Sequence, residues 1–273
     1  MGLNHSKYLT LLSHGANAEV IIVGAGPSGL LMGVLLAKEN IEVTLLDMGN
    51  ALDTNPRATH YATPAVMELR RAGVLDDVRA QGFTPDGVCW RKIDGTWLAG
   101  INMGVVKDDP NTMACLPLNR LGQVFMDHIV KYPSAKVLWS HEVIGIEQDE
   151  HAARVKVKTP EGEKTFEADY VVGCDGANSK VRRSLFGDWE FPGKTWDEQI
   201  VATNVYYPFE KFDYIDSNFI IHPEHWYMAA RITTDGMWRV SYGELAGLTR
   251  DEVQNPLSSW SDHTVNLSST VQI

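Results

Sequence analysis

The chain has 273 residues, 44% of them hydrophobic, and a formal net charge of −11. This length suits one large or two modest domains, and the acidic balance argues against nucleic acid as a partner. The three cysteines, Cys89, Cys115 and Cys174, make no CxxC pair and no disulfide framework, so we expect a cytoplasmic protein. No apolar run approaches the roughly 18 residues that a membrane span requires.

The first residues, Met1-Gly2-Leu3-Asn4-His5-Ser6, fit the template for N-myristoylation. Only Lys7 is basic nearby, so the second signal that stable membrane anchoring requires is missing. We therefore expect residues 1–16 to be a disordered segment before the first strand.

The first predicted elements form a strand, a glycine-rich turn, a helix and a second strand. The apolar run 20–23 predicts the first strand, 30–38 the helix, and 41–46 the second strand. The turn between the first strand and the helix reads Gly-Ala-Gly-Pro-Ser-Gly, which has the G-x-G-x-x-G spacing of dinucleotide-binding turns. A Gly-rich turn in another kind of α/β protein is the alternative, but the flanking strand and helix meet the context that the motif demands.

Each residue of this motif has a physical reason to be there. Gly24 permits the tight turn, Gly26 has no side chain to block a pyrophosphate, and Gly29 lets the helix approach the strand. The helix N-terminus offers N–H groups and the positive end of a dipole to phosphates. Asp47 follows the second strand, where its carboxylate can accept hydrogen bonds from the adenosine ribose hydroxyls.

Arg57 comes about ten residues after this acidic strand end, close to where the phosphates would lie, although a solvated surface arginine fits the spacing equally well. A helix is predicted next, with Thr63 as its N-cap, Pro64 at its first position and its end near Gly73.

The middle of the chain predicts a hairpin, a helix and several strands. Residues 88–93 and 97–101 flank Asp94-Gly95, which predicts a type I′ turn. A strand is predicted at 113–118 and a helix at 119–131. Further strands are predicted at 136–139, 143–148, 154–159 and 164–166.

A second motif runs from Asp169 to Arg183, where a buried strand ends in Gly-Cys-Asp-Gly and a helix follows at about Ser179. Asp175 and Gly176 are thereby placed at the carboxyl edge of a parallel sheet, where α/β proteins bind ligands. We interpret Asp175 as a cofactor contact rather than part of an ordinary turn.

From about residue 189 the sequence turns aromatic and alternates like a set of strands, at 200–206, 219–221, 226–232 and 237–242. The fold class that we expect is α/β, with a Rossmann-like domain and an inserted, mostly antiparallel β-sheet domain. The first domain is predicted at 17–82 and 112–188, and the inserted sheet at 83–111 and 189–257.

Together, Val20–Gly29, Asp47, Arg57 and Tyr170–Arg183 resemble the FAD-dependent aromatic hydroxylases, the p-hydroxybenzoate-hydroxylase-like monooxygenases. The run from Gly173 to Arg182 resembles that family's second fingerprint, which is tied to both FAD and NADPH. Phe191–Trp196 and Trp238–Glu244 are similar to fungal members active on phenolic polyketides, which implies a role in secondary metabolism.

The resemblance implies an enzyme in which NADPH reduces FAD, O2 reacts with the reduced flavin, and a phenolic or polyketide ring is hydroxylated. It also implies that Arg57 contacts the flavin nucleotide phosphates. A helix such as 119–131 usually offers Arg or Gln to the flavin, but the register puts Leu118 at that position, so Arg120 is a neighbouring candidate. No catalytic base is assigned, because Tyr227, Arg231, Trp238 and Tyr242 fit sheet packing equally well. The oligomeric state is left open.

One expected feature of the family is missing from the sequence. A third motif, Gly-Asp followed by small residues, His and later Pro, is expected after Glu244, and its Asp holds the ribityl chain. The chain reaches Ile273 without this motif and without the family's final helices. We expect a C-terminally truncated member with a frameshifted or alternatively spliced, disordered tail at 258–273. A truncated and catalytically inactive flavoprotein relative is therefore the alternative function.

Two other patterns have weaker claims. Tyr207 and Lys211 have the YxxxK spacing of short-chain reductases, but Pro208 between them argues against the helix that this motif needs. His222-Pro223-Glu224-His225 has HxxH spacing, and its proline favours a turn with surface histidines over a metal site.

Overall fold

A computed structural model describes residues 19–57, 59–188, 191–194, 196–244, 246–247 and 249. These residues form two compact units, which are considered separately. The first unit contains the described residues up to 57, together with 68–77 and 118–192, and the second contains those of 59–67, 78–117 and 193–249. The predicted disordered segments 1–16 and 258–273, with Gly2 and the tail, lie outside the described residues.

The first unit is built on a four-stranded parallel sheet with the order β11-β1-β2-β7. Its strands are β1 Glu19–Val23, β2 Glu42–Leu46, β7 Ala135–Leu138 and β11 Tyr170–Gly173. The apolar residues 20–23 of β1 are all buried, which fits a strand with neighbours on both edges and layers on both faces.

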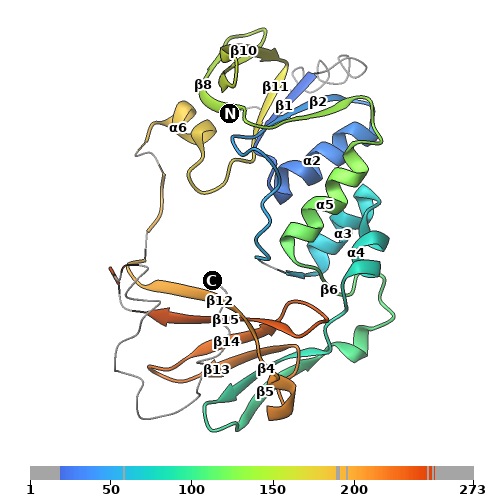
Figure 1. The fold of residues 1–273 in the computed structure, drawn as a ribbon, viewed down its shortest axis with the longest axis vertical. Helices are drawn as coiled ribbons and strands as arrows, with labels where there is room; N and C mark the ends of the chain where they lie inside the picture. Colours follow the sequence, from blue (N-terminus) through green and yellow to red (C-terminus); the bar gives the residue numbers. More distant parts are fainter. Residues whose placement is uncertain are drawn as a thin grey trace, which may run out of the picture. The chain divides into compact units, whose positions relative to one another are not determined.

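One face of this sheet is covered by helices α2 Pro27–Lys38 and α5 Leu118–Ile129, which pack against each other (Figure 1). Gly33 allows α2 to lie close to strand β2 of the sheet, because a Cβ at this residue would lie 3.0 Å from Cδ1 of Leu45. The predicted face of α5 is the buried one, since Leu121, Phe125 and Ile129 are almost completely shielded from solvent.

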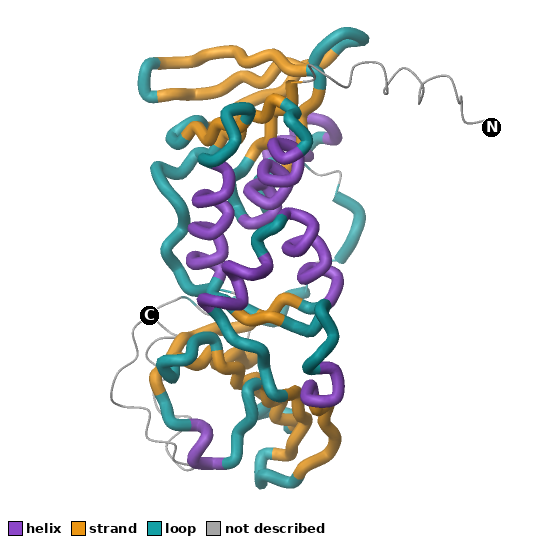
Figure 2. The backbone as a smooth tube through the Cα atoms, turned by 90° about the vertical axis from the view of Figure 1, so that its right-hand side faces the viewer, coloured by secondary structure: helices purple, strands orange, loops and turns teal. Residues whose placement is uncertain are grey.

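Alternation along β1 directs Ile21 and Val23 to the other face, where they share a core with residues of a second sheet and a short helix. This sheet is antiparallel and comprises β8 Glu142–Gln148, β9 Ala153–Thr159 and β10 Gly162–Ala168. It forms the ribbon at the top of Figures 1 and 2. The short helix is α6 Lys180–Phe186, whose Val181 joins the same core.

Two more helices, α3 Thr63–Ala72 and α4 Leu75–Gln81, occupy the stretches where the chain passes between the units. Thr63 is already the first helical residue, and the N–H of Val66 donates to the carbonyl of Ala62. The sequence had predicted Thr63 as the cap and Pro64 as the first helical residue. The helix therefore begins one residue earlier than predicted. No helix among the described residues is long and apolar enough to cross a membrane.

The second unit is built on a six-stranded sheet with the order β12-β15-β14-β13-β4-β5 (Figure 1). Its strands are β4 Gly87–Lys92, β5 Trp97–Asn102, β12 Gln199–Tyr206, β13 Ser217–Ile221, β14 Tyr227–Arg231 and β15 Met237–Glu244. All neighbours are antiparallel except β4 and β13, which run parallel. The predicted fold class, a parallel-sheet α/β domain with a mostly antiparallel inserted sheet, is therefore confirmed.

A short ribbon and two 3-10 turns complete the second unit. The ribbon pairs β3 His60–Tyr61 with β6 Ala114–Cys115, and the turns are η1 Met103–Val106 and η2 Phe209–Phe212. The first domain predicted from the sequence, 17–82 and 112–188, included residues 59–67, 78–82 and 112–117, which lie in this second unit.

The predicted type I′ turn at Asp94-Gly95 is wrong. Gly95 has φ of +87°, but Asp94 is not among the described non-glycine residues with positive φ, whereas a type I′ turn needs positive φ at both positions. The N–H of Gly95 donates to Lys92 and that of Lys92 to the carbonyl of Thr96, so the loop has three residues with glycine in the left-handed position. The carboxylate of Asp94 accepts the N–H of Thr96 at 2.9 Å, which stabilises this longer loop.

Candidate dinucleotide site

The turn after β1 is held by close backbone packing at two glycines. Gly24 has φ of +100°, and a Cβ there would lie 2.5 Å from the carbonyl oxygen of Cys174. A Cβ at Gly29 would lie 1.9 Å from the carbonyl oxygen of Gly24. Both positions therefore exclude any side chain, for reasons internal to the fold.

Gly26 differs from these two glycines, because a Cβ at Gly26 would have no atom within 4 Å. Gly26 is the N-cap of the twelve-residue helix α2, and no side chain caps this helix end. The open space thus lies directly before the N–H groups of the first turn of α2, where an anion is stabilised by hydrogen bonds and by the helix dipole.

Asp47 lies at the end of β2 and reaches across to the glycine turn. Its Oδ2 accepts the N–H of Ala25 at 2.6 Å, and its Oδ1 accepts the N–H of Gly49 at 2.7 Å. The carboxylate is half-buried. Each oxygen keeps capacity for a further hydrogen bond, so Asp47 can hold the turn and still accept hydroxyl groups of a ribose.

The second motif lies beside the first, because β11 pairs with β1 and the N–H of Cys174 donates to the carbonyl of Val23 at 2.7 Å. A Cβ on Gly24 would lie 3.0 Å from Cα of Asp175. The structure therefore brings the glycine turn and the Asp175 segment together at one edge of the parallel sheet, although they are far apart in sequence.

The carboxylate of Asp175 is directed at the start of helix α6. It accepts the hydroxyl of Ser179 at 2.6 Å, the N–H of Lys180 at 2.6 Å and the N–H of Val181 at 3.1 Å. The N-cap residue of α6 is Ser179, and the carboxylate of Asp175 adds a second set of capping contacts to the same helix start. Its neighbour Gly176 is exposed and has φ of +78°, and a Cβ at this residue would meet no atom within 4 Å.

The two predicted arginines lie near the start of α5. The carbonyl of Arg57 accepts the N–H of Leu118 at 3.1 Å, and the guanidinium of Arg57 is paired with the carboxylate of Asp53. The N–H of Asn55, together with this guanidinium, holds the pKa of Asp53 below its usual range. Arg120 is exposed on the first turn of α5.

In the second unit, two of the predicted ring-facing candidates are packing residues. Trp238 is buried in an apolar cluster with Val205 and Ala229, and the hydroxyls of Tyr227 and Tyr214 lie 2.5 Å apart at the edge of this cluster. Burial and this contact raise the pKa of Tyr227.

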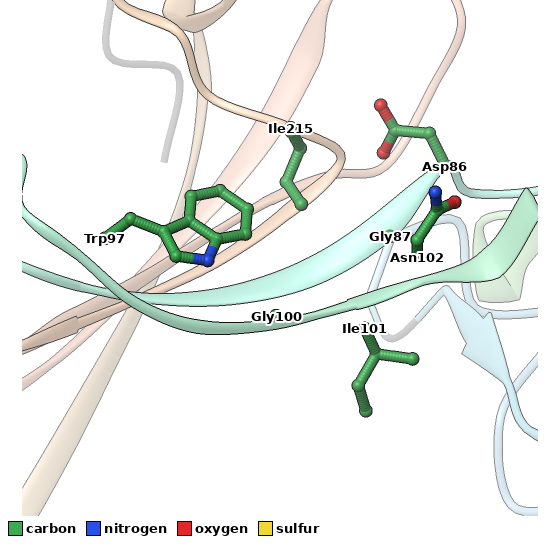
Figure 3. A pocket seen from close by; sticks show the side chains of 7 residues that line it. All are labelled: Asp86, Gly87, Trp97, Gly100, Ile101, Asn102 and Ile215. Carbon is green, nitrogen blue, oxygen red and sulfur yellow. The ribbon is translucent and has the colours of Figure 1, made fainter.

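A hollow of about 390 Å³ lies beside the β4–β5 hairpin. Figure 3 shows Trp97 and Ile215 on one side of the hairpin and Ile101 on the other. The carboxylate of Asp86, which also lines the hollow, already accepts the N–H of Asp216 at 3.0 Å. Asp86 is the one titratable side chain among the residues that line the hollow, and it is engaged with Asp216, so we assign the hollow no chemistry.

The two weaker motifs both lie outside α-helices in the structure. Pro208 precedes the short η2 turn, so Tyr207 and Lys211 do not share an α-helix. The rings of His222 and His225 stack at 5.0 Å. Within the described part of the chain, no group of three or more His, Cys, Asp or Glu side chains is arranged to hold a metal.

The comparisons with known proteins agree with this geometry. The family model described as "FAD binding domain" matches residues 17–242. Para-nitrophenol 4-monooxygenase of Pseudomonas sp. (strain WBC-3) is 33% identical over 240 residues, which are 87% of this chain and 59% of that protein. The 6-hydroxy-3-succinoylpyridine 3-monooxygenase HspB of Pseudomonas putida is 30% identical over 238 residues, 86% of this chain and 60% of the relative.

Among solved structures, p-nitrophenol 4-monooxygenase PnpA from Pseudomonas putida DLL-E4 superposes with a TM-score of 0.83 at 33% identity. The match covers 88% of this chain and 61% of that one, so the chain spans about six tenths of the length of these relatives. The resemblance inferred from the glycine turn and the second motif is thereby confirmed. The chain belongs to the FAD binding domain family.

Proposed function

We propose that the protein is an FAD-dependent monooxygenase that hydroxylates a phenolic or polyketide aromatic ring and takes its electrons from NADPH. The observation that carries the proposal is the open space at Gly26, set between the uncapped start of α2 and the carboxylate of Asp47. A Cβ would enter this space without touching protein, as expected of a position that a bound phosphate approaches.

The residues present fit an FAD molecule. The N–H groups at the start of α2 would hold the pyrophosphate above Gly26, and Asp47 would accept the adenosine ribose hydroxyls. Arg57 and Arg120 are proposed to contact the flavin nucleotide, and Asp175 and Gly176 to shape the cofactor site through the start of α6.

When bound, FAD supplies the redox chemistry, in which electrons from NADPH reduce O2 so that one oxygen atom enters the ring and the other leaves as water. The chain's own contribution is to bind and orient the cofactor and the ring. The named relatives act on a nitrophenol and a hydroxypyridine, and both compounds are ring systems activated by a hydroxyl group. The three cysteines are free, which supports placing the protein in the reducing cytoplasm.

The test is turnover by the 273-residue chain with FAD, NADPH, O2 and 4-nitrophenol. We expect NADPH oxidation that depends on the phenol and yields a stoichiometric oxygenated product. NADPH oxidation without product would indicate a flavoprotein that wastes its reductant as peroxide. Tight FAD binding with no NADPH oxidation would instead favour the alternative, a catalytically inactive flavoprotein relative.

A further inference from the structure

The ring of His60, in the second unit, is fixed by a side chain far away in sequence. It lies in the β3–β6 ribbon, and its Nε2 is 3.1 Å from the hydroxyl oxygen of Ser217 at the start of β13. This contact joins residues 157 positions apart. The imidazole therefore has a defined orientation with respect to the six-stranded sheet.

Ser217 is itself held rigidly, because both of its neighbours are anchored. Asp216 exchanges backbone-to-carboxylate hydrogen bonds of 2.9 and 3.0 Å with Asp86. Asn218 is fully buried and donates to the carbonyls of Ile215 and Ala229. A serine between two such anchors is a precise support for a second side chain.

The alternation of a strand separates Ser217 from the apolar cluster. The side chain of Asn218 faces Cys89 and Ala229, so those of Ser217 and Phe219 lie on the opposite face. There Phe219 stacks on Trp90 of β4, with ring centroids 5.8 Å apart. His60 is thus fixed on the sheet face that carries a half-buried aromatic pair.

The second nitrogen of the ring, Nδ1, remains available. Within the described residues no other hydrogen bond reaches the imidazole, and Nδ1 is not among their buried polar atoms that lack a partner. His60 is half-buried, and burial lowers its pKa below the ordinary 6.5, so the ring is neutral at neutral pH.

Among the described residues, the charged and titratable neighbours of His60 and Ser217 donate no hydrogen bond to the imidazole. On β6, Cys115 is paired with His60, and burial raises the pKa of its thiol. The Tyr61 hydroxyl donates to the carbonyl of Leu116. Beside Ser217, the charge of Asp216 is offset by Arg231, whose guanidinium lies 3.5 Å away.

We propose that His60 accepts the proton of the phenolic hydroxyl of the substrate and that Ser217 is its positioning residue. With Nε2–H donating to the Ser217 oxygen, the lone pair on Nδ1 takes the hydroxyl proton, which leaves a phenolate and an imidazolium. The O–H electrons stay on the phenolate oxygen, where they activate the ring for oxygen insertion. This inference rests on the proposed function, since it names the base for that reaction.

The first experiment measures the ionisation of bound 4-nitrophenol, which absorbs visible light only as the phenolate. The phenol is titrated with pH in the presence of excess FAD-loaded protein. We expect the midpoint to lie below that of free 4-nitrophenol for the parent protein. His60→Gln should lose this shift, with at least about a tenfold weaker ionisation constant. Glutamine retains a donor for Ser217, so the variant removes the base and keeps the support.

The control is His128→Gln, because His128 is also a shielded histidine with one hydrogen-bonded nitrogen, to Asp77 at 2.7 Å, but belongs to the first unit. This variant should keep the parent midpoint. Ser217→Ala should shift the midpoint part of the way towards the His60→Gln value. If bound 4-nitrophenol ionises at the same pH in the parent and in His60→Gln, the proposal is overturned. It is also overturned if the FAD-loaded protein does not bind 4-nitrophenol.

The second experiment needs no substrate. Diethyl pyrocarbonate carbethoxylates neutral, accessible imidazole nitrogens, and the modified residues are identified by peptide mass spectrometry at neutral pH. We expect His60 to react in the native protein and to be protected by 4-nitrophenol. An unreactive His60 would mean a sealed structural histidine and would overturn the proposal. If the parent protein does not bind FAD, the proposed function is contradicted. The reaction of His60 with diethyl pyrocarbonate then still shows whether its Nδ1 is accessible.

Discussion

The backbone N–H of Ala25 donates to Oδ2 of Asp47 across 2.6 Å, which joins the end of β1 to the end of β2. With the N–H of Gly49 on the other oxygen, the carboxylate holds the glycine turn from the side. The same residue that is expected to bind the ribose therefore also shapes the turn that receives the phosphates. Effects on binding and on stability must be separated when the site is tested.

Asp47→Asn should weaken both functions at once. The amide oxygen can accept only one of the two backbone N–H groups, and the amide nitrogen then faces the other as a second donor. We expect a loss of about 1–3 kcal/mol in the free energy of unfolding, measured by urea denaturation. An unchanged urea midpoint would show that the two backbone contacts contribute nothing.

The glycines of the turn should separate into two classes. Gly29→Ala places a Cβ 1.9 Å from a backbone oxygen and should cost about 3 kcal/mol of stability. In Gly26→Val the added Cβ meets no atom within 4 Å, so this variant should cost about 1 kcal/mol or less, mostly as a poorer helix cap. Thermal unfolding of both variants checks this ranking, and equal losses would contradict the open space at Gly26.

Asp175→Ala should lower stability by about 1–2 kcal/mol, because it leaves the N–H groups of Lys180 and Val181 without their acceptor, although Ser179 still caps α6. The matched control is Asp94→Ala, at another Asp-Gly pair, where the carboxylate accepts one exposed N–H. We expect that variant to lose about 0.5 kcal/mol or less. Urea midpoints measured side by side decide whether Asp175 is a cap or a dispensable turn residue.

Burial of His60 should make stability depend on pH. Because the folded-state pKa lies below the ordinary 6.5, protons bind the unfolded chain first as the pH falls. His60 therefore contributes a loss of stability that begins as the pH drops through 6.5 and continues to the folded-state pKa. Unfolding midpoints at about pH 7.5 and about pH 5.5 should differ less in His60→Gln than in the parent. An identical difference in both proteins would place His60 in a solvent-like environment.

Local chemistry made much of the first unit predictable. Gly24, Gly26, Gly29 and Asp47 occupy one turn, and the strands and helix around them lie close to their predicted bounds. The reason is that strand, turn and helix are contiguous there, so periodicity and glycine spacing describe the same short segment.

Pairings between distant segments were not predictable in this way. The parallel neighbours β4 and β13 are far apart in the chain, and no pattern in either strand names the other. His60 was missed for the same reason, because its partner Ser217 is distant and a single histidine in Thr-His-Tyr carries no spacing signal. The helix-capping role of Asp175 depends on the direction of its side chain, which an Asp-Gly pair does not specify.

The turn at Gly26 is proposed to bind FAD, and this is measured most directly by titrating the purified chain with FAD and following the quenching of flavin fluorescence. We predict saturable binding of one FAD per chain by the parent protein. In Gly26→Val we predict an affinity lower by at least about tenfold, which is about 1.4 kcal/mol of binding free energy, with the fold intact by circular dichroism. Equal FAD affinity in the parent and a folded Gly26→Val variant would mean that FAD does not bind at this turn.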